Sequence, residues 1–157
     1  MKGDNMKQVK DDIDTSKYTT LRDKWQKDYN DFPMGFAFSD DQLKEQMEKL
    51  GVKTVDELVA IPVGGGFIRK TDLKDFDAMI KRVHDEQEKA KDDDEYLYQM
   101  FVYEMGNCEY QLSGDTEYIL EVGCNMSLKD LKDERIMTIW KKAKKDFIHM
   151  CDVNEWY

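Results

Sequence analysis

The fold is decided by residues 92–108, DDDEYLYQMFVYEMGNC, where an acidic run opens into an apolar segment. Acidic side chains favour the positive N-terminus of a helix, so this run both ends one helix and begins the next. The apolar or thiol-bearing side chains that follow recur at helical spacing, at Leu97, Phe101, Met105 and Cys108. A helix with such an apolar stripe is stable when it is buried, so we expect it at the centre of the protein.

A glycine run, Gly64-Gly-Gly66, separates two short apolar stretches, Leu58 to Val63 and Phe67 to Lys70. Glycines permit the positive φ angles of tight turns, so the pattern predicts one small β-hairpin. A phosphate-binding loop is the other interpretation, because Lys70 stands where such a loop has its lysine before a helix. Arg69 occupies a position where that motif needs glycine, and the hairpin is therefore preferred.

Further helices are indicated by apolar residues at spacings of three and four between capping signals. Ser39 and Gln42 can cap a helix start reciprocally, and Gly51 is the matching stop. Thr71 is the candidate N-cap of a later helix. The expected core face of that later helix comprises Leu73, Phe76, Ile80 and Val83. The helices expected beside the central one are Thr15 to Asn30, Ser39 to Gly51, Thr71 to about Lys91, a short one through Ile119 and Val122 that closes at Gly123, and about Asp133 to Asp152.

Helices dominate this pattern and the sheet is minimal. We expect a mainly helical α+β protein, a single compact domain of five to seven helices with one small β-hairpin, over residues 15–157. Residues 1–14 carry seven charges and few apolar side chains. Burying so little apolar surface cannot offset the entropy of ordering a chain, so we expect a disordered or frayed tail there.

The charge balance limits the classes of partner. The 157 residues include 34 acidic and 24 basic side chains, a formal net charge of −10, which disfavours direct binding to nucleic-acid phosphates. No apolar run approaches the roughly 18 residues of a membrane span, and the first residues lack a signal-peptide pattern. Three cysteines are an awkward number for a disulfide framework. These features predict a cytoplasmic protein without membrane partners.

No pattern marks a catalytic or metal site. Cys108, Cys124, Cys151 and His149 lack the spacing of paired zinc ligands, so buried, reduced thiols are the preferred interpretation. His84 and His149 fall in charged helical turns without a partner that marks a general base. We therefore expect no enzyme, no metal and no cofactor. A metal-dependent enzyme built on clustered carboxylates stays as an alternative, because divalent ions bind such groups.

The charges are segregated along the chain. Residues 85–95 hold seven acids and two lysines, whereas residues 141–145 are locally +4. The acidic run is either a solvated helix end or a protein-binding surface that complements a basic groove. Tyrosines beside it would anchor a partner, because aromatic residues dominate interface hot spots. The candidate partner-binding residues are Asp85, Glu86, Glu88, Asp92, Asp93, Asp94, Glu95, Tyr96 and Tyr98.

Three short motifs add a resemblance that covers roughly Phe36 to the C-terminus. They are Phe36-Ala-Phe-Ser39 with Gln42, the glycine turn before Phe67-Ile-Arg-Lys70, and Asn107-Cys-Glu-Tyr110. Together they resemble small acidic proteins carried by bacteriophages and mobile elements of gut bacteria. The motifs are apolar-plus-turn patterns, so no catalytic residue is carried over. The resemblance implies a phage or mobile-element origin, and proteins of that origin include inhibitors of host defence such as anti-CRISPR proteins.

The sequence thus predicts a phage-type inhibitor, an anti-CRISPR protein, in the cytoplasm of a bacterial host cell. It would act as a DNA mimic, presenting carboxylates to a host effector that handles nucleic acid, such as a Cas nuclease. It would make no direct contact with nucleic acid. The alternative is an oligomeric phage scaffold or regulatory protein without enzymatic activity. In that case the tyrosine-rich helix would be a self-association face, in a homodimer or a larger oligomer.

Overall fold

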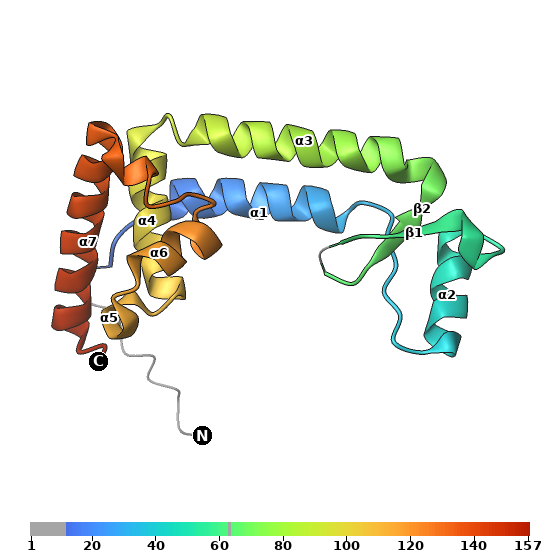
Figure 1. The fold of residues 1–157 in the computed structure, drawn as a ribbon. Coiled ribbons are helices and arrows are strands. Elements are labelled where there is room, and N and C mark those ends of the chain that lie inside the picture. The colour runs from blue at the N-terminus through green and yellow to red at the C-terminus, as the bar shows by residue number, and fades with distance from the viewer. Residues whose placement is uncertain (1–11, 63) are drawn as a thin grey trace, which may run out of the picture. The chain divides into compact units, whose positions relative to one another are not determined.

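The computed structural model describes residues 12–62 and 64–157 (Figure 1). The tail predicted for residues 1–14 lies mostly outside the described residues. The described part holds seven α-helices and a two-stranded antiparallel sheet, which confirms the predicted mainly helical α+β class. It divides into two compact units. The described residues of unit 1 are 12–22 and 89–157, and unit 2 is Asp23–Glu88. That residues 15–157 form one domain stays a prediction.

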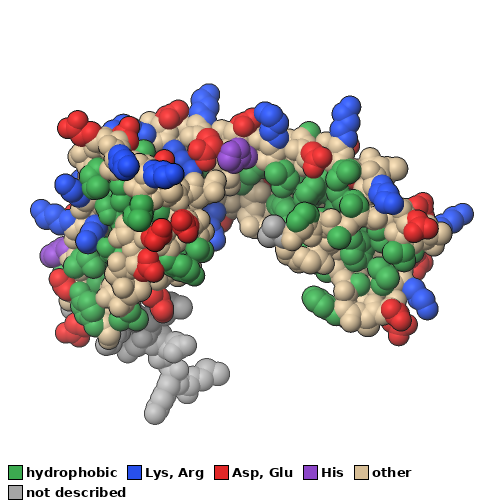
Figure 2. Space-filling view, viewed as in Figure 1, with side chains coloured by type: hydrophobic (Ala, Val, Ile, Leu, Met, Phe, Trp, Pro, Cys, Tyr) green, Lys and Arg blue, Asp and Glu red, His purple; other side chains and the backbone are tan. Residues whose placement is uncertain are grey.

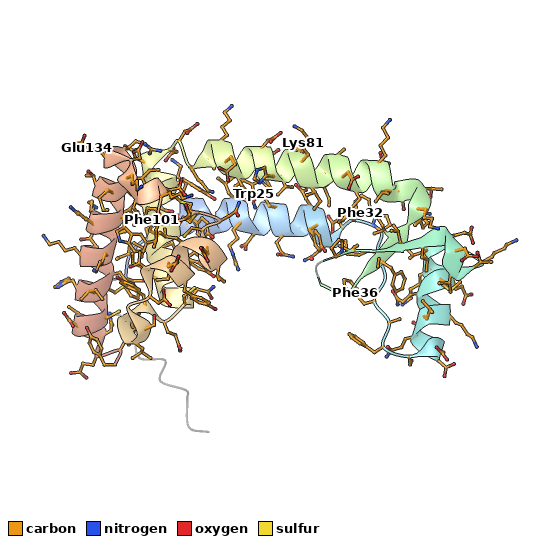
Figure 3. The ribbon with its side chains drawn as sticks, viewed as in Figure 1. Trp25, Phe32, Phe36, Lys81, Phe101 and Glu134 are labelled. Atoms are coloured by element: carbon orange, nitrogen blue, oxygen red, sulfur yellow. The ribbon has the colours of Figure 1, made fainter. Side chains whose placement is uncertain are left out.

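Unit 1 is built around helix α4 (Asp94–Asn107), along which helix α7 (Glu134–Asn154) packs. The central position predicted for this segment is confirmed, because Leu97, Phe101 and Met105 are fully buried. The Phe101 ring meets the indole of Trp140 edge-on, with ring centroids 5.1 Å apart, and Figure 3 labels Phe101 on α4. The shorter elements of unit 1 are α5 (Tyr110–Ser113), α6 (Thr116–Tyr118), the π-helical turn η3 (Ile119–Gly123) and the 3₁₀ turn η4 (Asp130–Lys132).

Both long helices of unit 1 begin at aspartate caps. The Asp93 carboxylate accepts a hydrogen bond from the backbone N–H of Tyr96 at 2.9 Å, and Asp133 accepts one from Ile136 at 3.0 Å. Each cap satisfies an N–H group that the helix itself leaves without a partner. The last helix therefore starts where the sequence predicted, and it ends two residues later than expected, at Asn154.

Unit 2 contains the predicted hairpin beside helix α2 (Asp40–Leu50). The Ser39 hydroxyl caps α2 by accepting from the Gln42 N–H at 3.2 Å, and Gly51 ends it with a φ of 70°. That left-handed conformation suits glycine because it has no Cβ. Strands β1 (Leu58–Ala60) and β2 (Phe67–Arg69) pair antiparallel with Val59 opposite Ile68, and Gly35 adds one further bridge to Phe67.

Two long helices carry the chain through the boundary between the units, α1 (Ser16–Asn30) and α3 (Leu73–Ala90). Their unit 2 parts pack on the hairpin. The Phe32 and Phe76 rings lie edge-on with centroids 5.1 Å apart, next to the buried Ile68, and Figure 3 labels Phe32. The core of unit 2 comprises Ile61, Ile68 and Phe76, with Tyr29, Phe32, Met34, Val59 and Met79 packed against it.

Two predictions for α3 were wrong. Thr71 does not cap the helix, because a 3₁₀ turn, η2 (Lys70–Asp72), precedes it and an ion pair of 2.6 Å between Arg69 and Asp72 closes that turn. Leu73 and Ile80 are exposed instead of buried. The core side of the helix carries Phe76 and Met79 instead.

Candidate functional site

The acidic run of residues 85–95, which we call the acidic ridge, is partly neutralised by basic side chains. In unit 2, Asp85 pairs with Lys81 at 2.8 Å, and that contact lowers the pKa of the Asp85 carboxyl. Glu86 accepts a hydrogen bond from the Trp25 indole at 2.7 Å and pairs with Arg82 at 3.1 Å. The indole and then the guanidinium lower the pKa of Glu86. Glu88 is exposed.

The unit 1 part of the ridge is neutralised less completely. Asp93 and Glu95 share the ammonium of Lys17, at 2.7 and 3.2 Å, and Lys17 lowers the pKa of Asp93. Asp94 pairs with Arg135 at 2.6 Å. Asp92 is exposed and makes no ion pair with any described residue. Within residues 92–95, three of the four carboxylates therefore contact the two basic side chains Lys17 and Arg135, and all four residues stay exposed.

The two tyrosines predicted as anchors occupy different environments. Tyr96 is only 3% exposed and lies against Tyr18 with ring centroids 5.5 Å apart, so it belongs to the core and not to an accessible surface. Tyr98 is half-buried. Its hydroxyl donates to Asp146 at 2.6 Å, and the Lys142 ammonium lies 4.1 Å from its ring centroid. A partner could reach only Tyr98 of this pair.

A second acidic surface, which sequence reasoning missed, lies on α6 and η3. Tyr118 and Val122 are 50% and 64% exposed, and they stand beside the exposed Glu117 and Glu121. We call these four residues the α6–η3 face. In Figure 2 acidic and hydrophobic side chains meet over the part of unit 1 where Figure 1 places α6. Neither glutamate makes an ion pair with a described residue. The sequence signal was available, because residues 92–128 contain no lysine, arginine or histidine.

Unit 1 also buries a carboxylate. Glu104 is 3% exposed, and its two oxygens accept hydrogen bonds from the Tyr18 hydroxyl at 2.6 Å and from the Asn107 amide at 3.2 Å. The backbone N–H of Tyr18 donates to the buried Gln99 at 3.1 Å. Gly123 lies so close that an added Cβ would stand 2.9 Å from the Cβ of Glu104. The network therefore ties α1 and η3 to the central helix.

A pocket of about 290 Å³ opens beside this network, between α4, α7 and residues 12–15. Its size is at the lower end of the roughly 300–1,000 Å³ of small-molecule sites. Asn107 lines it and donates inward to Glu104. Most of the other lining is apolar, including Ile13, Val102, Phe147, Met150 and Trp156.

Residues 17–146 match a protein family described as a family of unknown function, DUF7659. The chain belongs to this family. The matched residues include most of the described chain, with the acidic ridge, the α6–η3 face and Glu104. No curated protein and no solved structure matches the chain. Family membership thus assigns no activity, and a functional proposal for this DUF7659 protein has to rest on its surfaces.

The cysteines of this DUF7659 protein are free thiols, as the sequence predicted, and its histidines lie at the surface. Cys124 and Cys151 are buried and Cys108 is half-buried, all as free thiols, and His84 and His149 are exposed. Burial raises the pKa of the Cys124 thiol, which disfavours the nucleophilic thiolate. Within residues 12–62 and 64–157, no three His, Cys, Asp or Glu side chains lie together as metal ligands would. In the same residues no helix has the length and apolar character of a membrane span.

The buried thiol and phenol predict that alkaline pH destabilises the fold. Burial raises the pKa of Cys124, and burial together with the Glu104 contact raises that of Tyr18, so both ionise more readily in the unfolded chain. Each group's contribution to the free energy of unfolding is fully present below its pKa in the unfolded chain, about 8.5 for a thiol. It is lost as the pH rises above that value. Above the unfolded pKa of each group, about 8.5 for the thiol and about 10 for the phenol, we expect the free energy of unfolding to fall by up to about 1.4 kcal/mol per pH unit. Urea unfolding between pH 7.5 and 10.5 measures this, and Cys124→Ala should show a shallower decline. Equal slopes would show that Cys124 titrates alike in both states.

Proposed function

We propose that this DUF7659 protein acts by binding another protein through the carboxylates of unit 1. The partner is a host defence effector whose basic groove holds nucleic acid, and occupation of that groove inhibits it. The specific form of the proposal is a phage-borne anti-CRISPR inhibitor that mimics DNA and blocks a Cas nuclease in the bacterial cytoplasm. The resemblance to small acidic phage proteins and the net charge of −10 support it.

The observation that carries the proposal is the group of four exposed carboxylates at residues 92–95, at the start of α4. Asp94 and Glu95 are exposed although each contacts a basic side chain. Exposed ion pairs of this kind are worth about 1 kcal/mol or less, so a partner with denser positive charge can replace them. Grooves that hold nucleic acid present arrays of lysine and arginine that suit such carboxylates.

The alternative hypothesis, an oligomeric phage scaffold, required α4 as an exposed self-association face. Most of α4 is buried within unit 1, and Tyr103 is covered by Tyr18 at 5.4 Å between ring centroids and by the guanidinium of Arg22. Binding of a different protein is therefore the function that the geometry supports best.

Charge reversal at Asp92 and Asp94 tests the proposal. Asp93 stays unchanged because it caps α4, and its loss would cost about 1 kcal/mol of stability. We expect the Asp92→Lys, Asp94→Lys variant to remain folded and to inhibit about ten- to a hundredfold more weakly, mainly through slower association. The measurement is DNA cleavage by a Cas nuclease at low salt, titrated with each protein.

The matched control carries Glu48→Lys and Asp56→Lys, the same change of charge at exposed positions of unit 2. It should inhibit like the parent. Parent protein that leaves the nuclease fully active at low salt would contradict the anti-CRISPR form. Equal inhibition by the parent and the Asp92, Asp94 variant would instead remove the start of α4 from the binding surface.

A further inference from the structure

We infer that the α6–η3 face is a further partner contact, and that it binds a basic amphipathic segment of a protein. Apolar side chains of that segment would cover Tyr118 and Val122, while its lysines or arginines pair with Glu117 and Glu121. The inference deepens the proposed function and rests on its premise of a basic protein partner. It adds this face, which lies outside the acidic ridge, to the carboxylates at the start of α4 as a contact for that partner.

The backbone arranges the four side chains as two parallel rows. Glu117 and Glu121 are four residues apart, as are Tyr118 and Val122, and residues at this spacing are neighbours on a helix surface. On the opposite side, Ile119 and Leu120 are fully buried and hold the helix against unit 1. A face fixed in this way loses little conformational entropy when a partner binds.

The apolar row is what distinguishes this face from the acidic ridge. Tyr118 and Val122 together expose an aromatic ring and a branched aliphatic side chain to solvent. At the start of α4, by contrast, the neighbouring aromatic residue Tyr96 is in the core. Interfaces draw most of their binding energy from a few buried anchors, with aromatic residues prominent among them, and charged residues lie at the rim. The α6–η3 face has both components.

The charges identify the chemistry of the occupant. Glu117 and Glu121 make no ion pair with a described residue, whereas Asp93, Asp94 and Glu95 already contact basic side chains. A basic partner therefore breaks no existing pair when it binds the α6–η3 face. Residues 92–128 contain no basic side chain, and the Lys91 ammonium near this segment is engaged by the Asn125 carbonyl at 3.2 Å. A second copy of this chain, with its net charge of −10, is the less suitable occupant because like charges repel.

A synthetic helical peptide with leucines on one face and lysines on the other is the probe. Its counterpart with glutamates in place of the lysines is the control peptide. Backbone NMR spectra of the full-length protein, titrated with each peptide at low salt, locate the contact. We expect the lysine peptide to shift the resonances of residues 116–123 at the lowest concentrations, and the glutamate peptide to shift none.

Variants separate the two surfaces. We expect Glu117→Lys with Glu121→Lys, and separately Tyr118→Ser with Val122→Ser, to weaken binding of the lysine peptide at least tenfold. The matched controls lie in unit 2. They are Glu48→Lys with Asp56→Lys and the exposed apolar pair Phe38→Ser with Val55→Ser, and both should bind within about twofold of the parent. NMR spectra of every variant establish that it is folded.

Each outcome decides between the inference and the proposed function. Shifts confined to residues 92–95, or weakened binding only in the Asp92, Asp94 variant, would overturn the inference and leave the proposed function standing. Equal binding of both peptides, or self-association of the free protein through residues 116–123, would also overturn the inference. No binding of the lysine peptide at low salt would contradict the premise of a basic partner that both share.

Discussion

Replacing Phe101 by alanine should destabilise the protein by about 3–5 kcal/mol, the largest loss that we expect from any single side chain described above. Phe101 is fully buried on the central helix, and its ring packs edge-on against Trp140. Its removal leaves a cavity between the two longest helices of unit 1, whose surroundings can collapse only in part. Circular dichroism during urea and thermal unfolding measures the loss, which should lower the Tm by roughly 10 °C.

Phe38→Ala is the matched control, because the Phe38 side chain is 94% exposed. The same change of chemistry there should alter stability by about 0.5 kcal/mol or less. A Phe101→Ala variant as stable as Phe38→Ala would contradict the central position of α4 in the core.

Tyr18→Phe should be the second most damaging change, with a cost of about 2–3 kcal/mol. The substitution keeps the ring but removes the hydroxyl that donates to the buried Glu104 at 2.6 Å. One carboxylate oxygen then lacks its protein donor in a place that water reaches poorly, and buried polar groups without partners are costly. Urea unfolding at pH 7 measures the change.

Tyr118→Phe serves as the control for the loss of a tyrosine hydroxyl, since Tyr118 is half-exposed and its hydroxyl makes no hydrogen bond to a described residue. We expect it to unfold like the parent. If Tyr18→Phe also unfolds like the parent, then Asn107 or water satisfies Glu104 without help from Tyr18.

The helices and the hairpin could be predicted because their signals are local. The start of α2 is marked by Ser39 with Gln42, and its end is marked by Gly51. The glycine turn likewise marks the hairpin. The errors concern the start and the buried face of α3. The 3₁₀ turn at Lys70–Asp72 moves the start of α3 past Thr71, and Leu73 and Ile80 are exposed. Apolar spacing alone does not decide which of these side chains the neighbouring elements cover.

The candidate surfaces were harder to predict because pairing of charges is not local. The acidic run was visible in the sequence, but Lys17 reaches Asp93 from 76 residues away, and Arg135 reaches Asp94 from a helix 41 residues later. Only the folded structure shows that these two basic side chains pair with carboxylates of the acidic run. The burial of Glu104 had a signal, a lone acid within an otherwise apolar helical stretch, which could have marked it as a residue with buried partners.

The lack of basic residues between Asp92 and Leu128 has a consequence for how a partner can be captured. Reagents that join lysine to lysine cannot react with the α6–η3 face itself, so crosslinking mass spectrometry with them would report a partner there only through neighbouring lysines such as Lys91 and Lys129. Trypsin has no cleavage site in these residues either, so it would release the face within one long peptide that ends at Lys129. Carbodiimide coupling, which joins carboxylates to amines, would instead link Glu117 and Glu121 to the lysines of a bound partner.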